Sequence, residues 1–241
     1  MTQVNNIKKI KKMKQIHFIA LWMVLLLYGC ASITGYNDGR SLGEGKFEFT
    51  PSFNVTQSPD FDQDITVNNI VVFPNIELGG KYGVTEKLDA LIRFNTSLNF
   101  NAGIKYQLVG DRTSSFALGT GLEFGTFGFV TSIWNVQVPL YGSLHPSDMF
   151  TFYFSPRYIY LFSGIESSTG INYFGGNVGM MVGRKHKFCF DLGYYGLNSN
   201  GLSSSLSTIG MGGKFVFGGK DDDGTDTKTE FKSKKKKKKR R

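Results

Sequence analysis

Apolar and polar residues alternate along most of this chain, and no other feature constrains its fold as strongly. Strand side chains point to opposite faces in turn, so this pattern gives each strand one apolar and one polar face. A helix would show a period of about 3.6 residues, which no segment after Tyr28 has. The pattern is clear in 98–108, where one face carries Leu98, Phe100, Ala102, Ile104, Tyr106 and Leu108 and the other carries Asn99, Asn101, Gly103, Lys105 and Gln107.

Ten segments show this alternation, each about ten residues long, as strands that cross a membrane require. We predict strands at about 45–55, 69–84, 88–97, 98–108, 115–127, 129–144, 149–161, 171–184, 187–197 and 206–218. Such a series predicts an all-β fold, a single antiparallel up-and-down transmembrane β-barrel of about ten strands. The junctions near Ser97 and Gly128 are weak, so the prediction leaves room for eight to twelve strands.

The connections between these segments are of two kinds. Short polar turns are expected at 85–87, 110–112, 145–148 and 185–186, and longer loops at 57–64, 163–170 and 198–205. Barrels of the outer membrane have short periplasmic turns and longer outer loops. An even strand number then places both termini in the periplasm.

The first 29 residues resemble a bacterial lipoprotein signal peptide. Five lysines between Lys8 and Lys14 precede an apolar run over 16–28, which is too short for a membrane-spanning helix of about 20 residues. The run ends in Leu27-Tyr28-Gly29-Cys30, which is similar to a lipobox. The resemblance implies cleavage before Cys30 and lipidation of Cys30. An ordinary signal peptide is the alternative, and Met13 is an alternative start.

These observations divide the chain into a signal peptide (1–29), a polar periplasmic linker (30–44), the barrel (45–219) and a disordered charged tail (220–241). The net charge of +9 comes from the two ends, because all 19 acidic residues lie between residues 15 and 231. Nucleic-acid-binding proteins carry positive charge on a folded face, so we exclude nucleic acid as a partner. The partners expected are outer-membrane lipid and, for the basic run 234–241, anionic lipid or an envelope polymer. A solvated tail without a partner is the alternative.

The polar face of the predicted barrel carries a nearly balanced set of charges. A narrow lumen makes isolated charges costly, so we expect them to pair and to plug the barrel together with inward tyrosines at 141, 153, 173 and 195. A narrow path for ions or small solutes is the alternative. The predicted network consists of Lys46, Glu48, Glu77, Lys81, Asp89, Arg93, Lys105, Glu123, Arg157, Asp191 and Lys214.

The sequence offers no convincing catalytic or metal site, and we predict no enzyme activity and no cofactor. His145 and His186 fall in predicted turns, where solvation is expected, and the neighbours Ser147 and Asp148 only resemble a catalytic trio. The acidic run Asp60, Asp62 and Asp64 lacks the glycine and distal glutamate of a calcium loop. Cys189 is expected to be a small residue facing the lumen.

Region 45–218 resembles the small outer-membrane β-barrels of Gram-negative bacteria, of the porin-like and opacity-adhesin type. The resemblance rests on architecture, so it implies location and fold more strongly than activity. We predict a lipid-anchored, non-enzymatic barrel with a structural or adhesive role and contacts made by its outer loops. Two alternatives stay open: a narrow porin-like channel, and a lipid-anchored soluble β-sandwich or lipocalin-like periplasmic binder.

Overall fold

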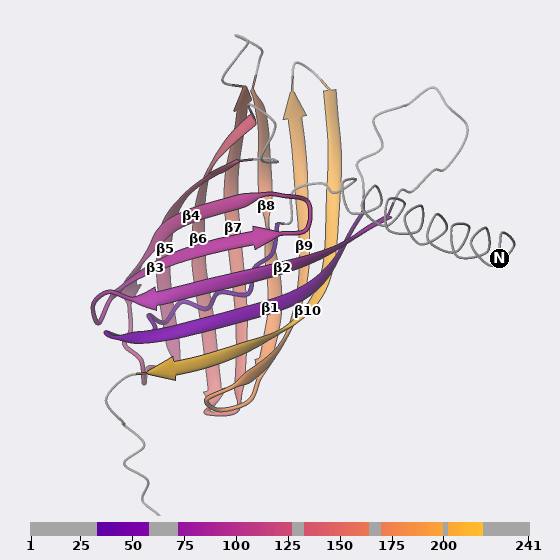
Figure 1. The fold of residues 1–241 in the computed structure, drawn as a ribbon. Helices are drawn as coiled ribbons and strands as arrows, with labels where there is room; N and C mark the ends of the chain where they lie inside the picture. Colours follow the sequence, from indigo (N-terminus) through magenta and orange to yellow (C-terminus); the bar gives the residue numbers. More distant parts are fainter. Residues whose placement is uncertain (1–32, 58–71, 127–132, 164–169, 200–201, 219–241) are drawn as a thin grey trace, which may run out of the picture.

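The computed structural model describes residues 33–57, 72–126, 133–163, 170–199 and 202–218. Within them lie ten strands that run up and down in chain order (Figure 1). Their bounds are β1 Lys46–Gln57, β2 Val72–Gly83, β3 Leu88–Asn95, β4 Phe100–Val109, β5 Phe116–Thr126, β6 Ile133–Ser147, β7 Phe150–Ser163, β8 Ile171–Val182, β9 Lys187–Ser199 and β10 Leu202–Gly218. The predicted signal peptide, the lipidation site, the acidic run 60–64 and the charged tail lie outside the described residues.

Each strand pairs antiparallel with its neighbours, and the sheet closes where β1 pairs with β10. At the closure Phe53 lies opposite Met211 of β10 on one side and Ile76 of β2 on the other. The prediction of an up-and-down barrel is therefore confirmed, and so is the choice of ten strands. The β-sandwich alternative is wrong, because the strands form one closed sheet with the apolar face outside.

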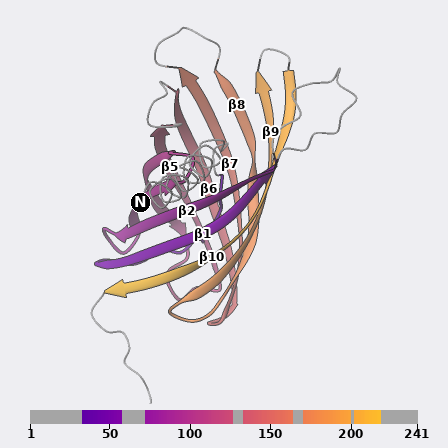
Figure 2. The same cartoon turned by 45° about the vertical axis from the view of Figure 1, so that its right-hand side comes forward.

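The alternation in the sequence corresponds to the two faces of this wall. Along β7, exposed and buried residues alternate from Phe150 to Leu161. Its aromatic residues Phe152 and Tyr158 face outward, and Thr151 and Arg157 face the lumen with 1 % of their surface exposed. Turned views show the strands side by side around a common interior (Figures 1 and 2). An apolar outer surface of this kind matches the lipid-facing band of an outer-membrane barrel.

The strand ends depart from the prediction in three places. β6 continues through His145 to Ser147, where a turn was expected. β9 and β10 extend to Ser199 and Leu202, so the long loop predicted at 198–205 is wrong. The serines of 203–205 pair with 196–198 along the backbone, which does not require apolar side chains. Leu98 lies in the connection between β3 and β4 with a φ of 59°, instead of beginning a strand.

Two ends of the barrel are distinguished by their connections. The turn end holds the turns β2–β3, β4–β5, β6–β7 and β8–β9, together with the start of β1 and the end of β10. The loop end holds the other connections. In the described part of the chain, no helix has the length and apolar character needed to cross a membrane.

Candidate functional site in the lumen

The residues just before β1 lie inside the barrel. Residues 33–43, called here the inner segment, are all buried or half-buried. Ile33 contacts the wall in the loop-end half, and Gly43 lies beside Gly83 at the turn end. The segment therefore runs along the lumen toward the turn end, where it joins β1. The sequence analysis predicted a periplasmic linker for 30–44 and gave no indication of this position.

The loop-end half of the lumen contains an apolar cluster. Ile33 of the inner segment is 2 % exposed and is surrounded by side chains from three strands of the wall. Burial of apolar surface is favourable and needs no specific partner atoms. The cluster consists of Ile33, Ile159, Leu161, Tyr195, Leu197 and Leu206, with Ile133, Ile171 and Tyr173 packed against it.

In the middle of the lumen, Thr34 joins the inner segment to opposite walls. Its hydroxyl donates to Glu77 of β2. Its carbonyl oxygen accepts from Arg93 of β3 at 3.3 Å and from Arg157 of β7 at 3.3 Å. These two guanidinium groups are 6 % and 1 % exposed, so an acceptor in the lumen offsets part of their desolvation.

The next two residues of the segment contact the wall in the same way. The Gly35 amide donates to Asp191 at 3.2 Å, and this carboxylate also accepts from Tyr153 at 2.5 Å and from Asn177 at 2.6 Å. The Tyr36 hydroxyl donates to Asn54 at 2.7 Å. Among the described residues, Asp191 is thus stabilised by hydrogen bonds and forms no ion pair with a basic side chain.

The wall itself supplies a central ion pair between Arg93 and Glu123. Tyr141 donates a hydrogen bond to the same Glu123 carboxylate at 2.7 Å, and Gln137 accepts from Arg157 at 3.1 Å. Glu123 and Tyr141 are both 0 % exposed. Together these side chains cross-link β3, β5, β6 and β7 through the interior.

Toward the turn end, Asp38 of the inner segment lies between two lysines of the wall. It is 3.9 Å from Lys105 and 4.0 Å from Lys214. Lys105 is also 3.4 Å from Asp89. Sequence reasoning missed Asp38, because its polar surroundings resemble a linker. The only signal was an imbalance of six basic and five acidic residues in the predicted network.

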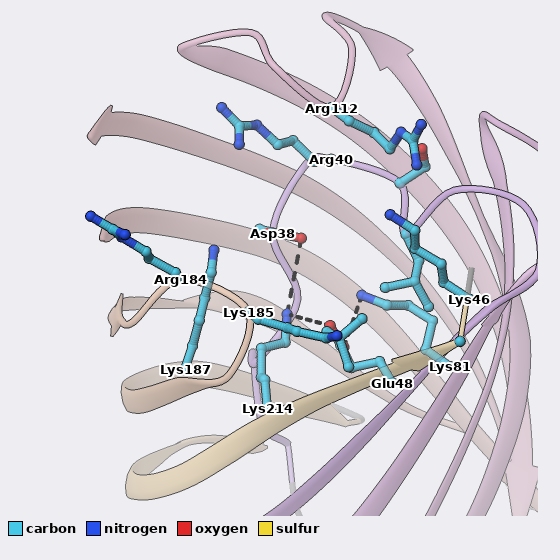
Figure 3. Close-up of a pocket in the computed structure, with 14 residues that line it drawn as sticks. Asp38, Arg40, Lys46, Glu48, Lys81, Arg112, Arg184, Lys185, Lys187 and Lys214 are labelled. Carbon is cyan, nitrogen blue, oxygen red and sulfur yellow. Dashed lines mark ion pairs between the residues drawn. The ribbon is translucent and has the colours of Figure 1, made fainter. Parts of the chain in front are cut away.

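Glu48 of β1 holds a second cluster of charges near the same end. It pairs with Lys81 at 3.0 Å and with Lys214 at 3.4 Å. The cluster lies near the turn end, where Figure 3 shows Asp38 and Glu48 bridged by Lys214.

Close approach of the inner segment to the wall requires glycine at residue 39. The Gly39 amide donates to the Ser143 hydroxyl at 2.9 Å. A Cβ at this position would lie 2.3 Å from the carbonyl oxygen of Ala117, which belongs to the backbone and cannot turn aside. Gly39 therefore allows the segment to lie flat against β5 and β6.

The structure places all eleven predicted network residues on the lumen side. Ten are no more than 6 % exposed, and Lys46 lies half-buried at the turn end. The ion pairs described above include Glu48, Lys81, Asp89, Arg93, Lys105, Glu123 and Lys214. Glu77, Arg157 and Asp191 instead bond to the inner segment and to neutral side chains. Some residues of the predicted network thus form ion pairs with one another, and others are paired through residues 34, 35 and 38 of the inner segment.

A cavity of about 320 Å³ remains at the turn end, beyond the inner segment. Its lining is strongly basic and includes side chains from the inner segment, from four strands and from two turns (Figure 3). The lining residues are Asp38, Arg40, Ser41, Leu42, Lys46, Glu48, Lys81, Arg112, Arg184, Lys185, Lys187, Lys214, Val216 and Gly218.

His145 is buried, which corrects the expectation of a solvated turn histidine. Its Nε2 lies 2.9 Å from the Ser143 hydroxyl and its Nδ1 lies 3.1 Å from the Thr151 hydroxyl. Ser143 is 0 % exposed and already accepts from Gly39. A serine nucleophile needs a base and access to substrate. This Ser–His pair has no access, so its geometry is that of a packed polar contact.

Two further residues singled out in the sequence are placed as follows. Cys189 is 0 % exposed and packs with Tyr36, Tyr153 and Met181. His186 is exposed in the β8–β9 turn, with its ring 5.7 Å from that of Phe215. Across the described ranges, no three histidine, cysteine, aspartate or glutamate side chains are placed to hold a metal ion.

Comparison with known proteins gives one family match. The sequence profile of the family described as "Type IX secretion system membrane protein PorP/SprF" matches residues 3–124, which is about half of the chain. The match covers the signal-like region, the inner segment and the strands up to β5. No curated protein matches the chain in sequence.

Among solved structures, the chain is similar to several outer-membrane proteins. An outer-membrane channel from Pseudomonas putida F1 is 11 % identical, with a TM-score of 0.41 over 76 % of this chain and 99 % of that one. OprG from Pseudomonas aeruginosa is 13 % identical, with a TM-score of 0.32 over 76 % and 100 %. Ail from Yersinia pestis is 9 % identical, with a TM-score of 0.31 over 72 % and 99 %.

Proposed function

This chain belongs to the PorP/SprF family of type IX secretion system membrane proteins, and on that premise we propose that it is a non-enzymatic, closed outer-membrane barrel. In this proposal it serves type IX secretion as a structural component of the membrane and not as a conduit. The observation that carries the proposal is the inner segment, which occupies the lumen over most of its length.

The inner segment supports a closed state at three successive levels. At the loop end Ile33 packs in an apolar cluster. In the middle Thr34 and Gly35 bond to Glu77, Arg93, Arg157 and Asp191. Nearer the turn end Asp38 lies between two lysines. A continuous water path would have to displace these contacts, and an unpaired buried charge is costly. A stable occupied lumen is therefore favoured.

The absence of catalysis is part of the proposal. Ser143 and His145 are both buried, and the second partner of the histidine is a threonine hydroxyl, not a carboxylate. A structural role leaves contacts with partners to the surfaces outside the membrane. Short turns face the periplasm in barrels of this kind, so we place the turn end there and assign outward contacts to the loop end.

The position of Ile33 limits how far the proposed lipid anchor at Cys30 can lie from the inner segment. Cys30 precedes Ile33 by three residues, and three residues span at most about 11 Å. Ile33 lies in the loop-end half of the lumen, whereas Gly218 ends β10 at the turn end. In this proposal a lipidated Cys30 is tied to the inner segment within that reach; Cys30 itself lies outside the described residues.

Single-channel recording in planar bilayers tests the closed lumen. We expect the intact protein to give no stable conductance steps, and a variant with residues 33–42 replaced by a Gly-Ser linker of equal length to conduct. Heat-modifiable gel migration verifies that each variant is a folded barrel. Stable steps from the intact protein, or a folded linker variant that stays silent, would contradict the proposal.

A single substitution gives a second route if the linker variant fails to fold. Gly39→Leu forces the segment away from Ala117 and leaves the wall sequence unchanged, so intermittent conductance is expected. Gly196→Ala is the matched control, because a Cβ there has only one neighbour, 3.8 Å away. The control is expected to stay closed.

A further inference from the structure

The cavity at the turn end holds far more positive than negative charge. Of its lining side chains, eight are lysine or arginine and two, Asp38 and Glu48, are acidic. Both acids already face buried lysines of the wall, Lys81, Lys105 and Lys214, at distances from 3.0 to 4.0 Å. Two of these lysines, Lys81 and Lys214, are among the eight lining bases, and Arg112 pairs with Glu86 at 3.4 Å. The surplus of positive charge therefore lies with the other five bases of the lining, Arg40, Lys46, Arg184, Lys185 and Lys187.

The outer part of the cavity is basic on several sides. Lys46 begins β1, and Arg184 and Lys185 belong to the β8–β9 turn, which lies at one side of the cavity in Figure 3. Lys187, which donates to the Thr151 hydroxyl at 3.0 Å, completes that side. Like charges gathered in a concave site raise the local potential and attract anions. The site therefore calls for a ligand with several negative charges.

The chain carries such a ligand immediately after the barrel. Val216 and Gly218, the end of β10, form part of the cavity lining. Asp221, Asp222 and Asp223 follow Gly218 by three to five residues, a reach of at most about 11 to 18 Å. We propose that the acidic run 221–223 docks in the basic cavity, which is thereby a polycarboxylate-binding site occupied by the chain's own carboxyl-terminal segment.

The tether makes this docking effective without strong individual contacts. Exposed ion pairs are weak singly. A connection of only two residues, 219 and 220, however, gives the acidic run an effective concentration in the millimolar range. Several weak lysine–carboxylate pairs then suffice to keep the cavity filled at low salt, and raised salt should release the run. A polyanion in solution would have to compete with the docked segment for the same side chains.

Zero-length carbodiimide cross-linking of the full-length folded protein tests the position of the run. We expect cross-links from residues 221–223 to Lys46, Lys185 or Lys187, identified by mass spectrometry and weakened at 1 M salt. A truncation after residue 231 is expected to retain them, because it removes only the basic run. Cross-links from residues 221–223 to none of the cavity lysines would overturn the proposal.

Binding of inorganic triphosphate tests the competition. The variant D221N/D222N/D223N is expected to bind this probe about tenfold more tightly than the intact protein at low salt. Triple substitution R184Q/K185Q/K187Q in that background should abolish the gain. The matched control E44Q/D226N/E230Q changes charge by the same amount, at positions outside both the run 221–223 and the cavity lining, and should bind as the intact protein does. Equal affinity of the intact and D221N/D222N/D223N proteins would overturn the proposal.

Discussion

The inner segment is held by different kinds of contact in the two halves of the lumen. In the loop-end half, aliphatic and aromatic side chains pack around Ile33. In the turn-end half, carboxylates and lysines meet around Asp38 and Glu48, and a basic cavity remains beyond them. Apolar packing tolerates changes of salt, whereas ion pairs depend on their partners and, near solvent, on ionic strength. The comparison separates apolar contacts at the loop end from ionic contacts at the turn end.

Removal of Glu48 is expected to have the largest effect on stability. Glu48→Ala takes away the 3.0 Å partner of Lys81 and one of the carboxylates next to Lys214. Loss of one partner of a buried ion pair costs about 3–5 kcal/mol. Urea unfolding followed by tryptophan fluorescence measures the loss. The double variant Glu48→Leu/Lys81→Met should recover most of it, and a double variant as unstable as the single one would contradict the pairing.

The apolar cluster at the loop end is tested by two leucines of the same strand. Leu197 is 6 % exposed inside the apolar cluster, and Leu192 is 44 % exposed on the outer face. Leu197→Ala leaves a cavity and should cost about 2–5 kcal/mol, as in other packed cores. Leu192→Ala is the matched control and should cost clearly less. Equal losses in urea unfolding would mean that the loop-end half is not packed as described.

A smaller change at the inner segment sharpens the same comparison. Ile33→Val removes one methylene group from the apolar cluster, so we expect a loss of about 0.5–1.5 kcal/mol. The loss should be the same at low and high salt, because no charge is involved. Thermal unfolding at two ionic strengths measures it. A strong salt dependence of the loss would contradict a purely apolar cluster.

The smallest effect is expected at a turn outside the membrane. Hydrogen bonds from Thr113 and Ser114 lower the pKa of Asp111 in the β4–β5 turn to about 2. A lowered folded-state pKa stabilises the turn above the ordinary aspartate value of about 3.9, and the contribution is lost as the pH falls through about 2. The difference in melting temperature between the intact protein and Asp111→Asn should therefore shrink between pH 5 and pH 2. A constant difference would contradict this assignment.

The wall could be predicted from sequence because its outer face is regular. A lipid-facing strand requires an apolar residue at every second position. Residues such as Phe152 and Tyr158 meet this requirement, and the pattern is visible within a single strand of the sequence. The inner face obeys a looser rule, since any side chain that finds a partner is tolerated. Leu161 and Leu197 lie in phase with Arg157 and Asp191, so the apolar loop-end half could have been inferred by following the inner positions to the strand ends.

The inner segment could not be inferred in this way. Its contacts join Thr34 to Arg157 and Gly39 to Ser143, residues that are far apart in the chain. Residues 33–43 show no period, because the segment touches a different strand at nearly every step. Polarity without a period is typical of a linker, and only the surplus of one base in the predicted network pointed to a missing carboxylate.

The position of the inner segment next to β1 bears on how the protein assembles. β1 pairs with β10 to close the sheet, so the ring is complete only when the last strand of the chain pairs with the first. The inner segment is continuous with β1 and fills the space that the ring surrounds. If the ring closed first, residues 33–43 would have to enter the lumen lengthwise from one end of the barrel. The ladder that completes the ring therefore begins directly after the segment that the ring surrounds.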